Sequence, residues 1–207
     1  QRVLESQRAD DKRAFTGEEQ RILKSVGERL TKQENSVNYV AFMDLYGHYY
    51  LLSNVNIGTY DFYRYYEKHD FLEETWSREA RAANGREVFY GKSVIGGISS
   101  QGFSIVKYLN APDTLKPMGY LVLDVNSRIL DKTFMTGNEG YDTNEYLIAD
   151  LRYNNLVRAR KGLSDASGLL NAFCSGEQQR YLFTSVHNSI TGWELVNAIE
   201  RNELSAE

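Results

Sequence analysis

The segment from Gly119 to Val125, with the sequence Gly-Tyr-Leu-Val-Leu-Asp-Val, contains a single charged residue among apolar and aromatic ones. Its length and its branched side chains are typical of a β-strand that is buried on both faces. Because side chains alternate along a strand, one face is expected to carry Leu121, Leu123 and Val125, and the other Tyr120, Val122 and Asp124. One face of the strand is then entirely apolar, whereas the other combines an aromatic ring with a carboxylate.

The hydrophobic pattern in the rest of residues 1–135 switches between helical and strand spacing. Apolar residues recur every three or four positions within 1–34 and 59–84, which predicts helices. Apolar residues alternate on both sides of the turn Asp44-Leu-Tyr-Gly47, which predicts a hairpin. The expected strands are 38–44, 48–53, 86–91 and 102–109, and a short helix is expected from Ser127 to about Phe134.

The later part of the chain partly repeats this order of elements. The stretch Tyr146-Leu-Ile-Ala-Asp150 echoes Val40-Ala-Phe-Met-Asp44, because in both an apolar strand ends in aspartate before a short turn and another strand. The other expected elements are strand 156–161, a helix from Ser164 to about Phe173, and strands 180–187 and 192–199. The repeat indicates two similar modules, and a chance match of a few residues is the alternative.

These patterns predict an α+β protein with a long N-terminal helix followed by two PAS-like modules built on antiparallel sheets. The helix is assigned to residues 1–35, the first module to residues 36–135 and the smaller second module to residues 136–207. The polar stretch 135–143, which contains two glycines, is the expected boundary.

Composition narrows the class of protein further. The net charge is −4, without long runs of one sign, which argues against a nucleic-acid partner. Cys174 is the only cysteine, so neither a disulfide nor a thiolate zinc site forms within one chain. No apolar run approaches the ~20 residues of a membrane span. Because the sequence starts with Gln1, we expect a fragment, such as a soluble piece between two membrane spans.

Motifs for catalysis are not recognisable in the sequence. His48, His69 and His187 are scattered, and no His-x-x-x-His or Cys-His spacing for zinc is present. There is neither a Gly-x-Ser-x-Gly elbow nor a phosphate-binding glycine loop. We therefore expect no metal, no cofactor and no enzymatic activity, with a hydrolase built from distant residues as the remaining enzymatic hypothesis.

Asp124 poses the functional question, because a buried carboxylate needs hydrogen bonds or a counter-charge. Its partner is either the backbone of a nearby loop or a bound molecule. Trp76 and Tyr90 pose a similar choice between core packing and contact with a ligand, and Trp193 is expected to fill the core of the second module. Asp44 and Asp150 lie between a strand and a turn, where aspartate bonds its own backbone.

Three stretches, taken in order, resemble double Cache sensor domains. They are Phe71-Leu-Glu-Glu-Thr-Trp-Ser-Arg-Glu-Ala80 followed by Gly85-Arg-Glu-Val88, then Gly119–Val125, and finally Thr191-Gly-Trp-Glu-Leu-Val196. The resemblance covers residues from about 36 to 204. It is nearest to the extracellular sensors of Gram-positive histidine kinases that work with AraC-type regulators.

The resemblance implies a ligand site in the first, membrane-distal module. In the amino-acid-binding branch of the family, a helix carries Arg-x-Trp-Tyr, and a tyrosine and an aspartate follow on later strands. Trp76, Tyr90 and Asp124 match the Trp, the strand Tyr and the Asp, and Tyr120 shares the strand face of Asp124. Glu74 stands in place of the arginine and Ser77 in place of the second tyrosine. A glutamate repels a carboxylate, so a cationic, neutral or sugar-like ligand is expected instead of a free α-amino acid held in the usual way.

The function implied is that of an extracellular small-molecule-sensing domain of a membrane-bound histidine kinase. The second module, which is membrane-proximal, is expected to relay the change, and two chains are expected to pair through their N-terminal helices. The alternatives are a chemoreceptor ectodomain, or a protein-protein interaction module whose pocket is filled by its own side chains.

Overall fold

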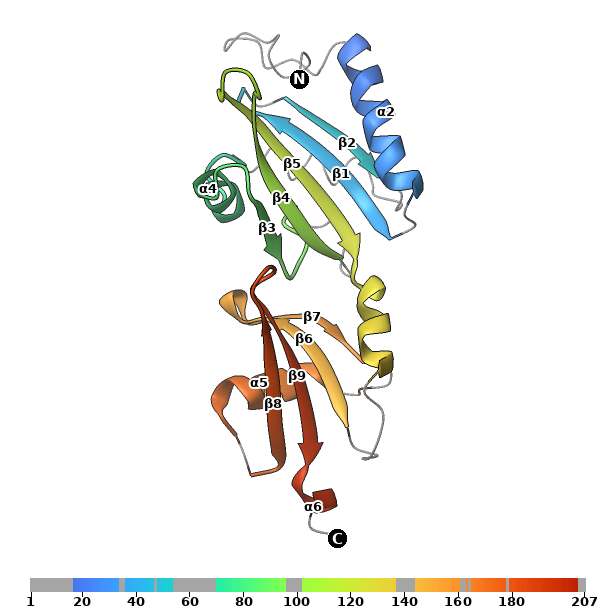
Figure 1. The fold of residues 1–207 in the computed structure, drawn as a ribbon, viewed down its shortest axis with the longest axis vertical. Coiled ribbons are helices and arrows are strands. Elements are labelled where there is room, and N and C mark those ends of the chain that lie inside the picture. The colour runs from blue at the N-terminus through green and yellow to red at the C-terminus, as the bar shows by residue number, and fades with distance from the viewer. Residues whose placement is uncertain are drawn as a thin grey trace. The chain divides into compact units, whose positions relative to one another are not determined.

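The computed structural model describes residues 17–33, 36–46, 48–53, 70–95, 102–136, 144–160, 163, 165–177 and 179–204. The contacts divide the chain into two compact units, Gln1–Asn126 and Ser127–Glu207 (Figure 1). The first sixteen residues of the expected N-terminal helix and positions 54–69 lie outside the described residues. Among the described residues, no helix is long and apolar enough to cross a membrane.

The first unit is built on a five-stranded antiparallel sheet with the strand order β2-β1-β5-β4-β3. The strand predicted at 119–125 is confirmed, because it forms the middle of the central strand β5. The predicted hairpin is also confirmed and consists of β1 and β2. The strands are β1 (Val37–Asp44), β2 (Tyr49–Ser53), β3 (Glu87–Tyr90), β4 (Gly102–Asn110) and β5 (Pro117–Asn126).

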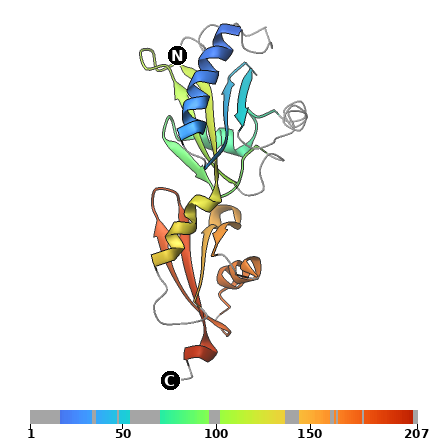
Figure 2. The same ribbon diagram turned by 90° about the vertical axis from the view of Figure 1, so that its right-hand side faces the viewer.

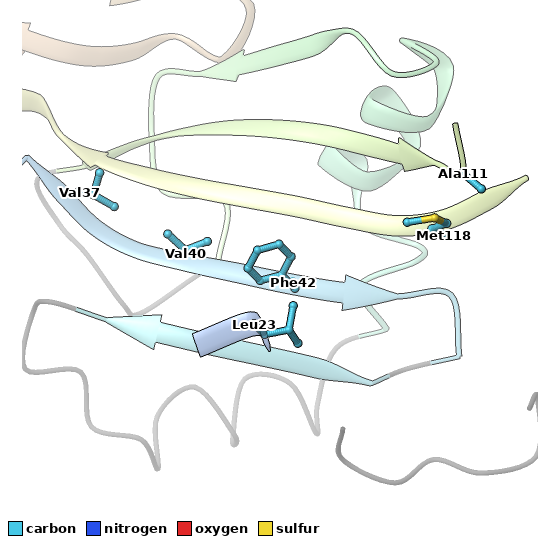
Figure 3. Close-up of a cluster of buried hydrophobic side chains, with 6 residues drawn as sticks. All are labelled: Leu23, Val37, Val40, Phe42, Ala111 and Met118. Atoms are coloured by element: carbon cyan, nitrogen blue, oxygen red, sulfur yellow. The ribbon is translucent and has the colours of Figure 1, made fainter. Parts of the chain in front are cut away.

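Helix α2 (Gly17–Gln33) covers one face of this sheet. Leu23 of α2 packs with five buried residues of the sheet and its loops, namely Val37, Val40, Phe42, Ala111 and Met118 (Figure 3). Leu121 and Leu123 of β5 lie against this cluster, as strand alternation predicts. Burying each such side chain contributes about 1.5–3 kcal/mol, so this interface anchors the helix to the sheet.

Helix α4 (Thr75–Ala82) packs on β3 and β4. Its buried residues are Trp76, Ser77 and Ala80. Trp76 contacts Tyr120, which alternation places on the opposite face of β5 from Leu121. The two helices therefore cover opposite faces of the first sheet (Figure 2).

The second unit is built on a four-stranded antiparallel sheet with the order β7-β6-β9-β8. The strands and the helix predicted after residue 145 are all present. Its elements are η1 (Ser127–Thr136), β6 (Glu145–Asp150), η2 (Leu151–Tyr153), β7 (Asn155–Ala159), α5 (Ala166–Ser175), β8 (Tyr181–Asn188), β9 (Trp193–Glu200) and α6 (Arg201–Leu204).

Helix α5 supplies the core of the second unit. Leu169 and Leu170 pack on Leu147, Ala149, Val196 and Ala198 of the sheet. The helix starts at Asp165, whose side chain accepts a hydrogen bond from the Gly168 N–H at 2.8 Å, and it ends at Gly176 with φ of 71°. Cys174, near the end of α5, is exposed and has a free thiol.

The short helix after β5 belongs to the second unit. It is a 3₁₀ helix, η1, whose Asp131 accepts two hydrogen bonds from Arg158 of β7, at 2.5 and 2.8 Å. The compact units thus divide at Asn126/Ser127, earlier in the chain than the polar stretch 135–143. The α+β class with two antiparallel sheets is confirmed, whereas the roles assigned to the two modules stay predictions.

Candidate functional site

A row of four polar side chains crosses the face of the first sheet that α4 covers. Tyr39 of β1 lies opposite Asp124 of β5, Asp124 lies opposite Ser104 of β4, and Ser104 lies opposite Tyr90 of β3. Directly paired residues of neighbouring antiparallel strands point to the same side of the sheet. The row therefore brings two of the predicted site residues, Tyr90 and Asp124, onto one surface.

Asp124 is fully buried and is held by side chains of the protein itself. The Asn38 amide donates to its Oδ1 at 2.7 Å, and the Ser104 hydroxyl donates to its Oδ2 at 3.2 Å. A bulge between Val37 and Tyr39 shifts the register and turns Asn38 inward. Neither residue could be found from sequence periodicity alone, because their contacts to Asp124 cross strands that are distant in the chain.

Burial raises the pKa of Asp124 from 3.8 to about 6, although hydrogen bonds from Asn38, Ser93, Ser104 and Tyr39 act in the opposite direction. Desolvation of the charged form therefore outweighs these bonds. Burial, and then the negative charge of Asp124, also raise the pKa of Tyr39, whose hydroxyl lies 2.9 Å from that of Ser93. The group is thus a buried polar network around one titrating carboxyl.

Close packing surrounds the carboxylate. A Cβ placed on Gly102 would overlap Asp124 Oδ1, so only glycine leaves room for the oxygen at this position. The Val94 N–H donates to the Ser104 hydroxyl at 3.0 Å, which ties the segment after β3 to the same network. The described hydrogen-bond partners of Asp124 are thus the side chains of Asn38 and Ser104, whereas one sequence-based hypothesis was the backbone of a nearby loop.

The other two predicted site residues, Trp76 and Tyr120, belong to an aromatic cluster. Their rings meet edge to face with centroids 5.6 Å apart, and Phe71 stacks on Trp76 with centroids 6.4 Å apart. Tyr108 contacts Tyr120 at 5.1 Å. The Tyr90 hydroxyl donates to the backbone oxygen of Trp76 at 3.1 Å, which links β3 to α4. The cluster therefore brings Trp76, Tyr90 and Tyr120 together.

Asp124 lies apart from Tyr120 along the same face. Val122 stands between them on β5, paired with Ala41 and Val106 of the neighbouring strands, and all three are fully buried. The face thus has a polar end at Asp124 and an aromatic end at Tyr120, with a band of small apolar side chains between them.

Arg81 approaches the aromatic end from α4, which the sequence pattern did not indicate. Its Nη2 and Nε donate to the Tyr120 hydroxyl at 2.9 and 3.2 Å. This hydrogen bond is the main cause that raises the pKa of Arg81. Arg81 lies outside the apolar stripe that predicted the helix, so its contact was not visible in the sequence.

The indole nitrogen of Trp76 is a buried donor without an acceptor among the described residues. The side chain is 5% exposed. A buried donor that is left unpaired costs about 1–3 kcal/mol, so natural proteins rarely keep one without a partner. This N–H therefore marks a position where a hydrogen-bond acceptor is expected.

Glu74 and Ser77, the two positions that depart from the double Cache pattern, lie at the start of helix α4. Glu74 is the N-cap residue, without a side-chain capping bond. The buried Ser77 hydroxyl donates to the backbone oxygens of Leu72 and Glu74, at 3.0 and 2.9 Å. Ser77 thus satisfies the backbone that leads into the helix, whereas a tyrosine there would have to point elsewhere.

The remaining aspartates and the second tryptophan have structural surroundings. Asp44 accepts bonds from the backbone of Tyr46 and His48 at 2.9 and 2.8 Å, as predicted. Asp150 binds the Arg152 guanidinium at 2.9 and 2.8 Å. Trp193 is buried in the second unit. No group of three potential metal ligands occurs in the part of the chain that the structure describes.

A groove of about 320 Å³ runs along α2. It is lined by Glu18, Arg21, Ile22, Ser25, Val26 and Arg29. None of the predicted ligand-binding residues lines it. Ile22 is 46% exposed there, which makes this face of α2 partly apolar.

Comparison with known proteins identifies the fold. No family model matches the chain, and no curated protein matches it in sequence. Among solved structures, the ligand-binding domain of Mlp24 with asparagine is similar with a TM-score of 0.61 and 12% identity, over 88% of this chain and 76% of that one. The extracellular domain of a candidate histidine kinase, vpHK1S-Z8, gives 0.54 and 10%, over 93% and 81%.

A third similar structure is the ligand-binding domain of the Pseudomonas aeruginosa PAO1 amino-acid chemoreceptor PctC with GABA. Its TM-score is 0.52 at 13% identity, over 86% of this chain and 80% of that chain. At these identities the likeness shows the fold. The chain therefore has the two-sheet fold found in extracellular sensor domains of histidine kinases and chemoreceptors.

Proposed function

We propose that the chain is the extracellular small-molecule-sensing domain of a membrane-bound histidine kinase of the type partnered with AraC-type regulators. The observation that carries this proposal is the buried Trp76 N–H, which has no acceptor among the described residues and lies next to Tyr90 and Tyr120, on the side of the sheet that holds Asp124. A bound molecule that accepts this hydrogen bond would remove the cost of the unpaired donor. The likeness to ectodomains that bind small molecules supports the same function.

The proposed ligand site runs from Trp76 and Tyr120 toward Asp124. Two acids, Glu74 and Asp124, favour a cationic, neutral or sugar-like ligand over a carboxylate held by an arginine at position 74. The similar structures hold asparagine and GABA, so amino acids and amines belong in the same screen. Because Asp124 already accepts hydrogen bonds from side chains of the protein, a ligand would have to join this network or displace one of its members.

In the proposed protein, the first unit is membrane-distal and the second relays the signal to the membrane. Pairing of two chains through their N-terminal helices would bring two kinases together. The groove along α2, with its exposed Ile22, supports helix pairing because it offers an apolar strip between charged residues.

A thermal-shift screen with amino acids, amines and sugars tests ligand binding. A ligand present at ~100 times its dissociation constant should stabilise the protein by about 2.7 kcal/mol. The gain should be lost in the Trp76→Ala, Asp124→Ala double variant and kept in Trp193→Phe, which changes the other unit. A gain that persists in the double variant would place the pocket elsewhere.

The bonds that Asp124 makes to Asn38 and Ser104 favour a second candidate, a protein-interaction module whose first unit is filled by its own side chains. A chemoreceptor ectodomain is compatible with the same site. Screening separates the interaction module from the sensors, because no small molecule should then stabilise the chain. The output domain encoded next to the chain separates the kinase from the chemoreceptor.

A further inference from the structure

Strand β8 is an edge of the second sheet at a position that is covered in the first. Both sheets follow one strand order, so β2-β1-β5-β4 corresponds to β7-β6-β9-β8. In the first sheet β4 is flanked by β5 and β3, whereas β8 pairs only with β9 among the described strands. Among the described residues, the second sheet thus has no counterpart of β3.

The composition of β8 is unusual for an edge strand. It runs for eight residues, Tyr-Leu-Phe-Thr-Ser-Val-His-Asn, without Asp, Glu, Lys, Arg or Pro. Natural edge strands are usually short, charged, broken by proline or covered, because an open edge pairs with other strands. β8 carries none of the sequence features that prevent such pairing.

The other edges of the two sheets are four or five residues long, against eight residues in β8. β7 has five residues and contacts both η1 and α5, and its Arg158 is paired with Asp131. β2 also has five residues and packs against α2. β3 has four residues and carries Glu87, which binds Lys107 at 2.5 Å. The difference singles out β8 as a pairing edge.

One face of β8 is apolar and exposed. Leu182 is 39% and Val186 is 68% exposed, and they pair across the strands with Ile199 and Leu195 of β9. The opposite face carries Phe183, whose ring contacts Phe173 of α5 at 5.5 Å. Two exposed apolar side chains therefore lie at the open edge on one side, while on the other side the half-buried Tyr181 and Phe183 pack against the core.

The backbone pattern shows which groups of β8 point outward. The Arg180 carbonyl accepts a hydrogen bond from the Arg201 N–H at 2.9 Å, so residue 180 directs its polar groups toward the β9 side. In an antiparallel pair this orientation repeats at every second residue. Residues 182, 184, 186 and 188 thus face β9, and the N–H and C=O groups of 181, 183, 185 and 187 face the open edge.

We infer that β8 is a dimerisation strand that pairs antiparallel with β8 of a second copy of this chain, about a two-fold axis at Thr184. This register places Leu182 opposite Val186 of the partner subunit and sets Thr184 against its own copy. The outward residues 183 and 185 then form the hydrogen-bonded pairs, as the backbone pattern requires. The exposed apolar side chains of the two copies join into one surface across the new eight-stranded sheet.

In this register, two copies of β8 place apolar side chains opposite apolar side chains, which favours a second copy over an unrelated strand. Because β8 contains no Asp, Glu, Lys or Arg, no like charges of these residues oppose one another in this register. A register shifted to an axis at Ser185 would set Leu182 against Asn188 and Val186 against Thr184, so both apolar pairs would be lost. An isologous contact of this kind gives a closed dimer.

Pairing through β8 can be tested separately from pairing through the N-terminal helix. The two contacts are separable by mutation, since β8 lies in the second unit and α2 in the first.

Disulfide cross-linking tests the register directly. In a Cys174→Ser background, which removes the exposed native thiol, Thr184→Cys places two sulfurs across the axis. Non-hydrogen-bonded antiparallel pairs have Cα atoms about 4.5 Å apart, within the range that a disulfide spans. Mild oxidation should therefore give a covalent dimer of the folded chain on a non-reducing gel.

Matched variants provide the controls. Val186→Cys alone should cross-link far more slowly, because its two copies lie about 14 Å apart along the paired strands. An equal mixture of Leu182→Cys and Val186→Cys should cross-link rapidly, because these residues face each other. Equal rates for Thr184→Cys and Val186→Cys, or no cross-link in either Thr184→Cys or the mixture, would overturn the proposal.

Sedimentation equilibrium gives a second measurement that does not depend on cysteine. Thr184→Lys sets two lysines against each other and should weaken dimerisation at least tenfold, whereas Asn171→Lys on exposed α5 should not. Circular dichroism confirms that both variants are folded. A dimer that is equally strong in both, or a wild-type chain that stays monomeric at every concentration, would contradict pairing through β8.

Discussion

Strands β1, β2, β4 and β5 of the first sheet correspond to β6, β7, β8 and β9 of the second, and both β1 and β6 end in an aspartate before the next turn. When Asp44 and Asp150 are aligned, the pair Tyr39 and Asp124 corresponds to Glu145 and Ala198. Asp124 and Ala198 are both fully buried. At one position, the first unit keeps a carboxyl group and the second keeps a methyl group.

The two positions also differ in their surroundings. Around Ala198 the described core cluster consists of aliphatic and aromatic side chains, whose burial stabilises the unit. Around Asp124 the first unit places an amide and a hydroxyl, and on the same face the indole N–H of Trp76 has no acceptor among the described residues. A buried carboxyl group is costly unless it is satisfied, so its presence at this position in the first unit, where the second unit has Ala198, is consistent with ligand binding in the first unit.

The strongest test of the comparison is to place the carboxylate in the second core. Ala198→Asp should destabilise the protein by about 3–5 kcal/mol, because the described residues that pack around this position form an apolar cluster and offer a buried charge no partner. The measurement is urea unfolding at pH 7. Ala198→Ser serves as the control for size and should cost less. A small effect of Ala198→Asp would show that the second core accepts polar groups as the first does.

The pH dependence of stability should depend on Asp124. Its folded-state pKa is raised from 3.8 to about 6, so the folded state binds the proton more tightly and this stabilisation is present below pH 4. It is lost as the pH rises from about 4 to about 6, by about 3 kcal/mol at 1.4 kcal/mol per unit.

Urea unfolding of wild type and of Asp124→Asn across pH 4–8 measures this contribution as the difference between the two curves. Asparagine keeps the size of the side chain but does not titrate. Parallel curves would show that Asp124 does not carry the pH dependence.

The two glycines that precede Tyr120 and Trp193 should differ in their tolerance of alanine. Gly119 has φ of 152°, and a Cβ there would overlap the Met43 carbonyl oxygen. Gly192 has φ of 73°, and its nearest neighbour would be Arg152 at 3.6 Å. Gly119→Ala should cost about 3 kcal/mol from strain and overlap, and Gly192→Ala about 1 kcal/mol from strain alone. Equal losses in thermal unfolding would contradict the difference in packing.

Trp76→Phe is expected to change the stability of the free protein only slightly. It removes the indole N–H and keeps most of the aromatic packing, so the free protein should lose less than about 1.5 kcal/mol. Binding of any ligand found by the screen should weaken at least tenfold in isothermal titration. Unchanged affinity would mean that the N–H does not face the ligand.

The sequence predicted elements whose signals are local. The alternation of Tyr39, Ala41 and Met43 and the turn after Asp44 identified the hairpin, and the apolar run after Gly119 identified the central strand. The stripe containing Trp76 identified part of α4.

The environment of the site could not be predicted in the same way. Asn38 reaches Asp124 only because of a bulge, and Ser104 reaches it only because β4 pairs with β5. Both contacts depend on strand register, which is decided by the packing of the whole sheet. Arg81 reaches Tyr120 from outside the apolar stripe of its helix, so periodicity carried no signal for it.

Each unit of the chain contains one of its two tryptophans, Trp76 in the first and Trp193 in the second, and both side chains are buried. Intrinsic fluorescence of Trp193→Phe would therefore follow the melting of the first unit alone, and that of Trp76→Phe the melting of the second. The protein carries its own pair of optical reporters, with which cooperativity between its halves becomes a directly observable quantity.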